Sequence, residues 1–199
     1  MTKLAKVRKT TADYLTRPAA RFLARTSITP NTITWSGFLL SVGAAALIAT
    51  GHPFTAGFVV LVAGLFDLLD GALARLTNQV TRFGAILDST IDRLAEAALL
   101  LGILILFARE QSFLGILLAG IALPGSFLVS YIRARAEAAG LECQVGLFTR
   151  GERVIVLVLG LLLSRFDYAL ITALGILILF SFITVVQRIF HVWRQTKAD

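Results

Sequence analysis

The sequence has few of the side chains that cover the surface of a soluble protein. Charged residues make up only 16% of its 199 residues, hydrophobic residues make up 57%, and the mean hydropathy is +0.82. So few polar groups cannot cover a globular domain in water. The composition therefore excludes an ordinary soluble domain and predicts that a lipid bilayer surrounds much of the chain.

Cysteine and histidine are also scarce. Cys143 is the only cysteine, which excludes an internal disulfide and a metal site built from several cysteines. The two histidines, His52 and His191, stand alone near the ends of apolar segments, and we expect structural roles for both. The chain also lacks repeats, low-complexity tracts and linkers rich in serine and glycine, so we expect a single domain over residues 1–199.

The excess of positive charge is concentrated near the beginning of the chain. The net charge is +7, and seven of the 19 basic residues precede the first apolar segment: Lys3, Lys6, Arg8, Lys9, Arg17, Arg21 and Arg25. A nucleic-acid partner is not expected, because basic and aromatic residues do not alternate on a soluble face. We interpret residues 1–28 as a cytoplasmic or interfacial segment that faces anionic lipid. Within it, residues 9–26 have the pattern of an interfacial amphipathic helix, and the first 26 residues are too polar for a signal-peptide core.

Apolar segments long enough to cross a bilayer follow. They cover residues 33–52, 54–76, 84–107, 112–136, 153–165 with flanks, and 168–190. Because a backbone in hydrocarbon must satisfy its own hydrogen bonds, we expect an all-α bundle of six transmembrane helices. With both termini in the cytoplasm, most basic connections lie on the cytoplasmic side, which favours a multi-pass protein of the cell membrane with a cytoplasmic active site.

Four aspartates lie in or beside two of these apolar segments, where an isolated carboxylate is costly. Asp67 and Asp70 are spaced i, i+3, and Asp88 and Asp92 are spaced i, i+4, so each pair shares one face of its predicted helix. A short turn joins the two helices, so both faces can meet near the cytoplasmic side. Repulsion among the carboxylates is relieved by hard divalent cations, so the spacing predicts a site for Mg²⁺ or Mn²⁺ with room for two ions. The alternative is a set of intramembrane ion pairs with arginines: Arg75, Arg82 and Arg93.

The stretch that holds these aspartates reads DLLDGALARLTNQVTRFGAILDSTID. It resembles, at every specified position, the CDP-alcohol phosphotransferase signature D-x2-D-G-x2-A-R-x8-G-x3-D-x3-D. The resemblance implies an enzyme that transfers a phosphatidyl-type group from a CDP-linked lipid to an alcohol. It also implies that Asp67, Asp70, Asp88 and Asp92 hold metal ions and that Asp92 is the general base.

The resemblance further implies a CDP-lipid pocket. Its residues are Asn31, Thr32, Ile33, Thr34, Gly71, Arg75 and Thr81. Short polar side chains at a helix start can hydrogen-bond a cytidine or a pyrophosphate. A structural alternative remains for two of them, namely that Asn31 or Thr32 caps the first membrane helix behind Pro30.

Other stretches resemble the bacterial and archaeal inositol phosphate branch of this family: TPNTIT at 29–34, SYIRARAEAAGL at 130–141 and TRGERVIVLVLG at 149–160. This likeness implies CDP-diacylglycerol or CDP-archaeol as donor, 1D-myo-inositol 3-phosphate as acceptor, and a homodimer. It also implies that three arginines bind the acceptor phosphate: Arg133, Arg153 and Arg188. The alternative is that these arginines only obey the positive-inside rule. Glu137 and Glu152 are expected to orient arginines, and Glu96 to pair with Arg93 one turn back.

Two other functions stay open. The same chemistry on glycerol 3-phosphate or another small alcohol uses the same signature. A divalent-cation transporter would use the aspartates as a permeation site, although such proteins often carry inverted repeats, which this sequence lacks.

Overall fold

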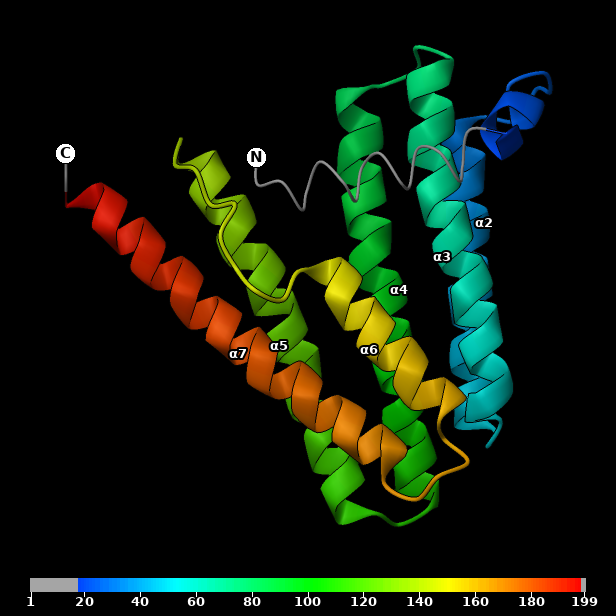
Figure 1. Cartoon of the computed structure of the whole chain (residues 1–199), viewed down its shortest axis with the longest axis vertical. Coiled ribbons are helices and arrows are strands. Elements are labelled where there is room, and N and C mark those ends of the chain that lie inside the picture. Colours follow the sequence, from blue (N-terminus) through cyan, green and yellow to red (C-terminus); the bar gives the residue numbers. More distant parts are fainter. Residues whose placement is uncertain (1–17, 198–199) are drawn as a thin grey trace. The chain divides into compact units, whose positions relative to one another are not determined.

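The computed structural model describes residues 18–197, and within this range the regular structure is entirely helical. A short helical stretch covers residues 18–23. The longer helices are α2 (Pro30–Ala49), α3 (Pro53–Leu76), α4 (Arg82–Arg109), α5 (Phe113–Ala138), α6 (Arg150–Leu162) and α7 (Ala169–Thr196) (Figure 1). Each predicted apolar segment coincides with one of these helices, which confirms the all-α class.

The first half of the predicted amphipathic helix over residues 9–26, residues 9–17, lies outside the described residues. The same holds for five of the N-terminal basic residues: Lys3, Lys6, Arg8, Lys9 and Arg17. Arg21 lies in the helical stretch at 18–23, and Arg25 follows it. The interfacial role of this segment therefore stays a prediction.

Four of the helices are long and apolar enough to cross a membrane, namely α2, α3, α5 and α7. Their outer surfaces are apolar: Leu39 on α2 is 66% exposed, Leu65 on α3 is 56% exposed and Leu179 on α7 is 58% exposed. Large apolar side chains exposed in such number mark a surface that faces lipid. The chain is therefore a membrane protein.

Helices α4 and α6 differ from these four in composition or in length. Helix α4 has 28 residues, but charged side chains occupy its first half, and α6 has only 13 residues. A helix of 13 residues is about 20 Å long, shorter than the hydrocarbon core of a typical bilayer. Membrane crossing by these two helices stays a prediction.

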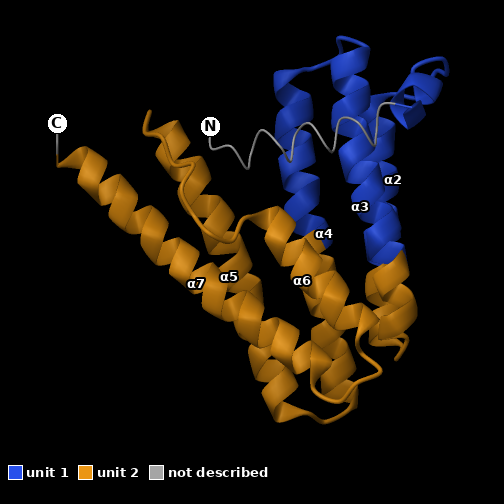
Figure 2. Cartoon of the chain, in the orientation of Figure 1, with its two compact units in different colours: residues 1–43, 59–95 blue, residues 44–58, 96–199 orange. Residues whose placement is uncertain are grey.

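The chain divides into two compact units (Figure 2). The first comprises residues up to 43 and residues 59–95, so it holds most of α2 and α3 and the first half of α4. Its core includes Ile33, Leu73 and Ile91. The second comprises residues 44–58 and 96–199, and in it α7 packs against both α5 and α6 (Figure 1).

Helices α2 and α4 approach each other closely in the second unit because Gly102 has no side chain. A Cβ atom at Gly102 would lie 2.6 Å from the backbone oxygen of Ala45 and 3.0 Å from its Cα. Backbone atoms cannot move aside as the end of a side chain can. Small residues allow such close helix packing in membranes.

Replacing Gly102 with alanine is therefore expected to destabilise the protein by about 1–3 kcal/mol, the usual cost of overpacking. The measurement is thermal unfolding in detergent. Gly120→Ala in α5 is the matched control, because a Cβ atom there meets no atom within 4 Å. Equal stability of the two variants would contradict the prediction.

Candidate active site

Three of the predicted metal ligands converge in the first unit. Asp67 comes from α3, and Asp88 and Asp92 come from adjacent turns of α4. One carboxylate oxygen of each residue lies within 4.8 Å of one oxygen of each of the other two residues. All three residues are half-buried. The helix faces predicted from the spacing therefore do meet.

This group fits a divalent cation. Its donors are carboxylate oxygens, the ligands that Mg²⁺ and Mn²⁺ prefer. Three anionic groups this close repel one another, and a cation among them removes that penalty. Asp67, Asp88 and Asp92 are accordingly the residues that would hold the metal.

Asp70 is not one of these three converging carboxylates, although it lies within electrostatic range of Asp67 and Asp88. It is buried, with 5% of its surface exposed, and its Oδ2 accepts a hydrogen bond of 2.6 Å from the Thr34 hydroxyl. Its Oδ1 lies 2.5 Å from the backbone N–H of Gly71. These contacts fix the carboxylate between α2 and α3. Its role as a fourth metal ligand stays a prediction.

A cavity of about 270 Å³ lies beside these residues in the first unit, and both Asp70 and Asp88 line it. The residues predicted for the CDP-lipid pocket that line it are Asn31, Thr34, Gly71, Arg75 and Thr81. The cavity is thus lined by the start of α2, the end of α3 and the start of α4.

Thr32 and Ile33 do not line this cavity. Ile33 is buried in the core with 4% of its surface exposed. The Thr32 hydroxyl lies 2.9 Å from that of Thr29 and is directed to the helix start. Side chains at i and i+3 of a helix share a face, so Asn31 and Thr34 point to the cavity together while the two residues between them point elsewhere.

The caps of α2 and α4 lie at the cavity. Thr29, not Asn31 or Thr32, caps α2: the Thr29 hydroxyl accepts a hydrogen bond from the backbone N–H of Thr32 at 3.3 Å, and Pro30 is the first helical residue. The Thr81 hydroxyl accepts from the N–H of Gly84 at 2.9 Å and so caps α4. Thr81 therefore holds a helix end while it lines the cavity.

Several other residues line the cavity but were not predicted from the sequence as pocket residues: Pro30, Gln79, Val80, Gly84 and Ala85. A signal was present for Gly84, because the signature specifies a glycine there. The structure gives the reason, since a Cβ atom at Gly84 would lie 2.9 Å from the Thr81 hydroxyl. Any larger residue would disturb the cap of α4.

Because the resemblance implies that a CDP-lipid binds in this cavity, filling it at Gly71 is expected to impair that binding. A Cβ atom there would lie 3.3 Å from Nη1 of Arg75, the mobile end of a long side chain, so Gly71→Ala is tolerated. Gly71→Leu extends into the hollow and is expected to raise the donor KM by about tenfold or more, the effect of losing roughly 1.4 kcal/mol of binding. Donor titrations of CMP release measure this effect. Gly64→Leu, on the same helix with open space around its Cβ position, should leave the donor KM unchanged.

The three predicted phosphate-binding arginines all lie in the second unit, on α5, α6 and α7. Arg188 lies within electrostatic range of both Arg133 and Arg153. Arg133 is half-exposed and pairs with Glu137 at 2.8 Å, as predicted. Arg188 is buried; its Nε donates to the backbone oxygen of Val145 at 2.9 Å, and its Nη1 donates to that of Val129.

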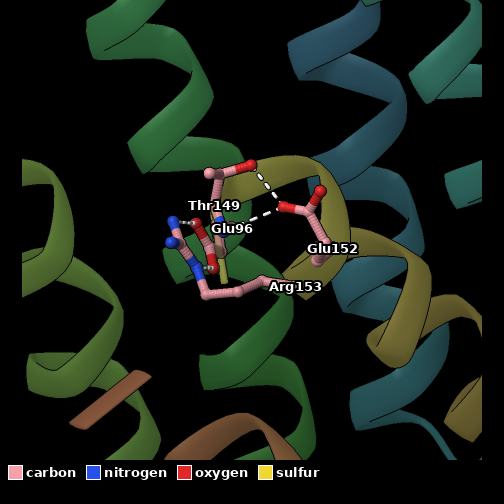
Figure 3. A network of polar contacts seen from close by, with 4 residues as sticks. All are labelled: Glu96, Thr149, Glu152 and Arg153. Carbon is pink, nitrogen blue, oxygen red and sulfur yellow. Dashed lines mark hydrogen bonds and ion pairs between the residues drawn. The ribbon is translucent and has the colours of Figure 1, made fainter. Parts of the chain in front are cut away.

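Arg153 is the most enclosed of the three, with 1% of its surface exposed. Its Nε and Nη2 donate to the two carboxylate oxygens of Glu96, at 2.6 Å and 2.8 Å (Figure 3). The expected pair between Glu96 and Arg93 is therefore wrong, and Arg93 instead donates to the backbone oxygen of Ser89. Glu152 accepts hydrogen bonds from the N–H and the hydroxyl of Thr149, and so helps to cap α6.

Comparison with known proteins places this geometry in a family. The CDP-alcohol phosphatidyltransferase profile matches residues 27–193. The chain is 36% identical to the archaetidylinositol phosphate synthase of Methanothermobacter thermautotrophicus, over 87% of each chain. It is 39% identical to the phosphatidylinositol phosphate synthase of Mycobacterium tuberculosis, over 100% of this chain and 94% of the relative.

A crystal structure of the Mycobacterium tuberculosis synthase with CDP-diacylglycerol bound is similar, with a TM-score of 0.84 and 39% identity, covering 90% of this chain and 94% of that one. Another structure of that synthase, in complex with manganese and citrate, has a TM-score of 0.82 and 40% identity, covering 89% of this chain and 88% of that one. The chain belongs to the CDP-alcohol phosphatidyltransferase family and is a transferase.

Proposed function

We propose that this protein transfers a phosphatidyl or archaetidyl group from a CDP-linked lipid to 1D-myo-inositol 3-phosphate, with release of CMP. The observation that carries the proposal is that Asp67, Asp88 and Asp92 converge in the first unit. The same unit holds the cavity that other residues of the signature line. The similarity to inositol phosphate synthases over nearly the whole chain supports the choice of acceptor.

The donor is CDP-diacylglycerol or CDP-archaeol. Its CDP group occupies the cavity lined by Asn31, Thr34, Gly71, Arg75 and Thr81. The guanidinium of Arg75 balances the charge of the diphosphate, and the hydroxyl and amide groups supply directional hydrogen bonds. The cavity of about 270 Å³ has no room for two long lipid chains beside the CDP group, so the acyl or isoprenoid chains extend outside it into the bilayer.

Asp67, Asp88 and Asp92, with Asp70 as a fourth ligand, would hold Mg²⁺ or Mn²⁺ and have enough carboxylates for two ions. When bound, such ions neutralise the charge of the diphosphate and of the leaving CMP.

Asp92 acts as the general base. Its carboxylate takes the proton of the acceptor hydroxyl, whose oxygen forms a bond to the phosphorus on the lipid side of the diphosphate. The bond from that phosphorus to the bridging oxygen breaks, and its electron pair leaves with CMP. The acceptor oxygen attacks directly, so the reaction needs no serine or cysteine nucleophile.

The acceptor phosphate is bound by Arg133, Arg153 and Arg188. A phosphate dianion needs fixed cations, and arginine offers planar pairs of donors that match phosphate oxygens. The electrostatic proximity of Arg188 to the other two arginines supports this group.

The two units belong to one catalytic domain, a proposal supported by the family profile, which spans both. All six helices α2–α7 cross the cell membrane, α6 together with its flanking residues. Residues 1–28 lie in the cytoplasm or at its interface, and both termini and the active site are on the cytoplasmic side. The positive-inside rule supports this orientation. The protein acts as a homodimer, as the resemblance implies, and chemical crosslinking in native membranes tests that assembly.

The decisive experiment supplies the purified protein with CDP-diacylglycerol, Mg²⁺ or Mn²⁺, and one acceptor at a time. Release of CMP with inositol 3-phosphate is expected, and addition of EDTA should abolish it. Release only with glycerol 3-phosphate, serine or free inositol would replace the proposed acceptor. Metal flux into liposomes without CMP release would favour the transporter.

A further inference from the structure

The buried pair of Glu96 and Arg153 has a geometry that plain charge neutralisation does not require. Both side chains are almost fully enclosed, with 3% and 1% of their surfaces exposed. Glu96 uses both oxygens on one edge of the guanidinium, the edge formed by Nε and Nη2 (Figure 3). A two-point contact of this kind fixes the plane of the guanidinium and its rotation.

The remaining nitrogen of Arg153 has a different environment. Nη1 is buried, and no hydrogen-bond partner for it exists among the described residues. Native proteins rarely leave a buried donor of a charged group unmatched, because the lost hydration is costly. The neighbouring Glu152 is turned to Thr149, to which it is hydrogen-bonded (Figure 3). Nη1 of Arg153 is thus a buried hydrogen-bond donor without a partner among the described residues.

We propose that Glu96 is a positioning residue for the acceptor: by holding Nε and Nη2 of Arg153, it presents Nη1 to an oxygen of the acceptor phosphate. This inference rests on the proposed acceptor role of Arg153. The contact with Glu96 is made before any ligand binds, so the plane of the guanidinium is already fixed when the phosphate approaches. Glu96 acts only through Arg153 and does not touch the substrate.

The test substitutes Glu96 with glutamine. Glutamine has nearly the same volume but offers only one acceptor oxygen. Its NH₂ group replaces the other oxygen, and it cannot accept a hydrogen bond from the guanidinium. The guanidinium then rotates away from its fixed plane. The acceptor KM is expected to rise by about tenfold or more, the range that one charge-assisted hydrogen bond supplies. The KM for the CDP-lipid should change by less than about twofold, because neither residue lines the cavity proposed for that substrate.

Two further variants complete the experiment. Glu96→Asp keeps both oxygens and the charge, so its acceptor KM should lie between those of the parent protein and the glutamine variant. This variant also tests the proposal if the glutamine variant does not fold. Glu110→Gln, the same substitution at an exposed residue just after the other end of α4, should match the parent protein.

The outcomes separate the two proposals. If the parent protein releases no CMP with inositol 3-phosphate, the proposed function fails. If it does, and the glutamine variant keeps the parent acceptor KM, the positioning role is wrong. Equal rises in donor and acceptor KM, or loss of active protein with both KM values unchanged, would show a structural role only and would also overturn the inference.

Discussion

Replacing Asp92 with asparagine is expected to lower kcat for CMP release by about 10²–10⁴-fold, the range that a general base contributes. Asparagine has nearly the same shape but cannot accept the proton of the acceptor hydroxyl. Asp92 lies with Asp67 and Asp88 in a half-buried group, so the variant also loses one of three converging charges. The measurement is kcat at saturating donor, acceptor and Mn²⁺.

The design must separate loss of the base from loss of the metal. Raising the Mn²⁺ concentration should restore a variant that only binds metal weakly, whereas a missing base stays missing. Asp88→Asn provides that comparison, since Asp88 belongs to the same group without the proposed proton transfer. Asp167→Asn, at an exposed aspartate in the second unit, controls for the substitution itself. Full activity of Asp92→Asn would contradict the base assignment.

The carboxylate group could be predicted from the sequence because its geometry is local. Helical periodicity sets Asp88 and Asp92 on one face, and the short connection between α3 and α4 brings Asp67 to that face. The same rule could have removed Thr32 and Ile33 from the predicted pocket, since Asn31 and Thr34 already share the face that lines it. Pro30 likewise indicates a cap at Thr29, because proline favours the first helical position.

The pair of Glu96 and Arg153 could not be predicted in this way. Its partners are 57 positions apart in the sequence, and only the packing of α4 and α6 brings them together. The local spacing favoured Arg93 instead, which lies one turn before Glu96 and donates to the backbone oxygen of Ser89. Pairs between distant helices depend on rotation about each helix axis, and periodicity alone does not define that rotation.

Breaking this buried pair from one side is expected to have the largest effect on stability. Arg153→Met leaves the Glu96 carboxylate enclosed without its cation, with 3% of the Glu96 side chain exposed. Loss of one partner from a buried ion pair typically costs about 3–5 kcal/mol. Unfolding in detergent, followed by the fluorescence of Trp35 and Trp193, measures the loss. A decrease below about 1 kcal/mol would contradict the prediction, because an unpaired enclosed carboxylate costs more than that.

Removing both charges separates folding from function. Glu96→Met with Arg153→Met fills similar space with apolar groups, and such replacements are often neutral or stabilising. The double variant is therefore expected to recover most of the stability lost by Arg153→Met. Its loss of stability should be smaller than the sum of the losses of the two single variants. It also lacks the Nη1 donor, so its acceptor KM should stay high although the protein is folded. A stable double variant with a poor acceptor KM would mean that the pair is present for acceptor binding and not for stability.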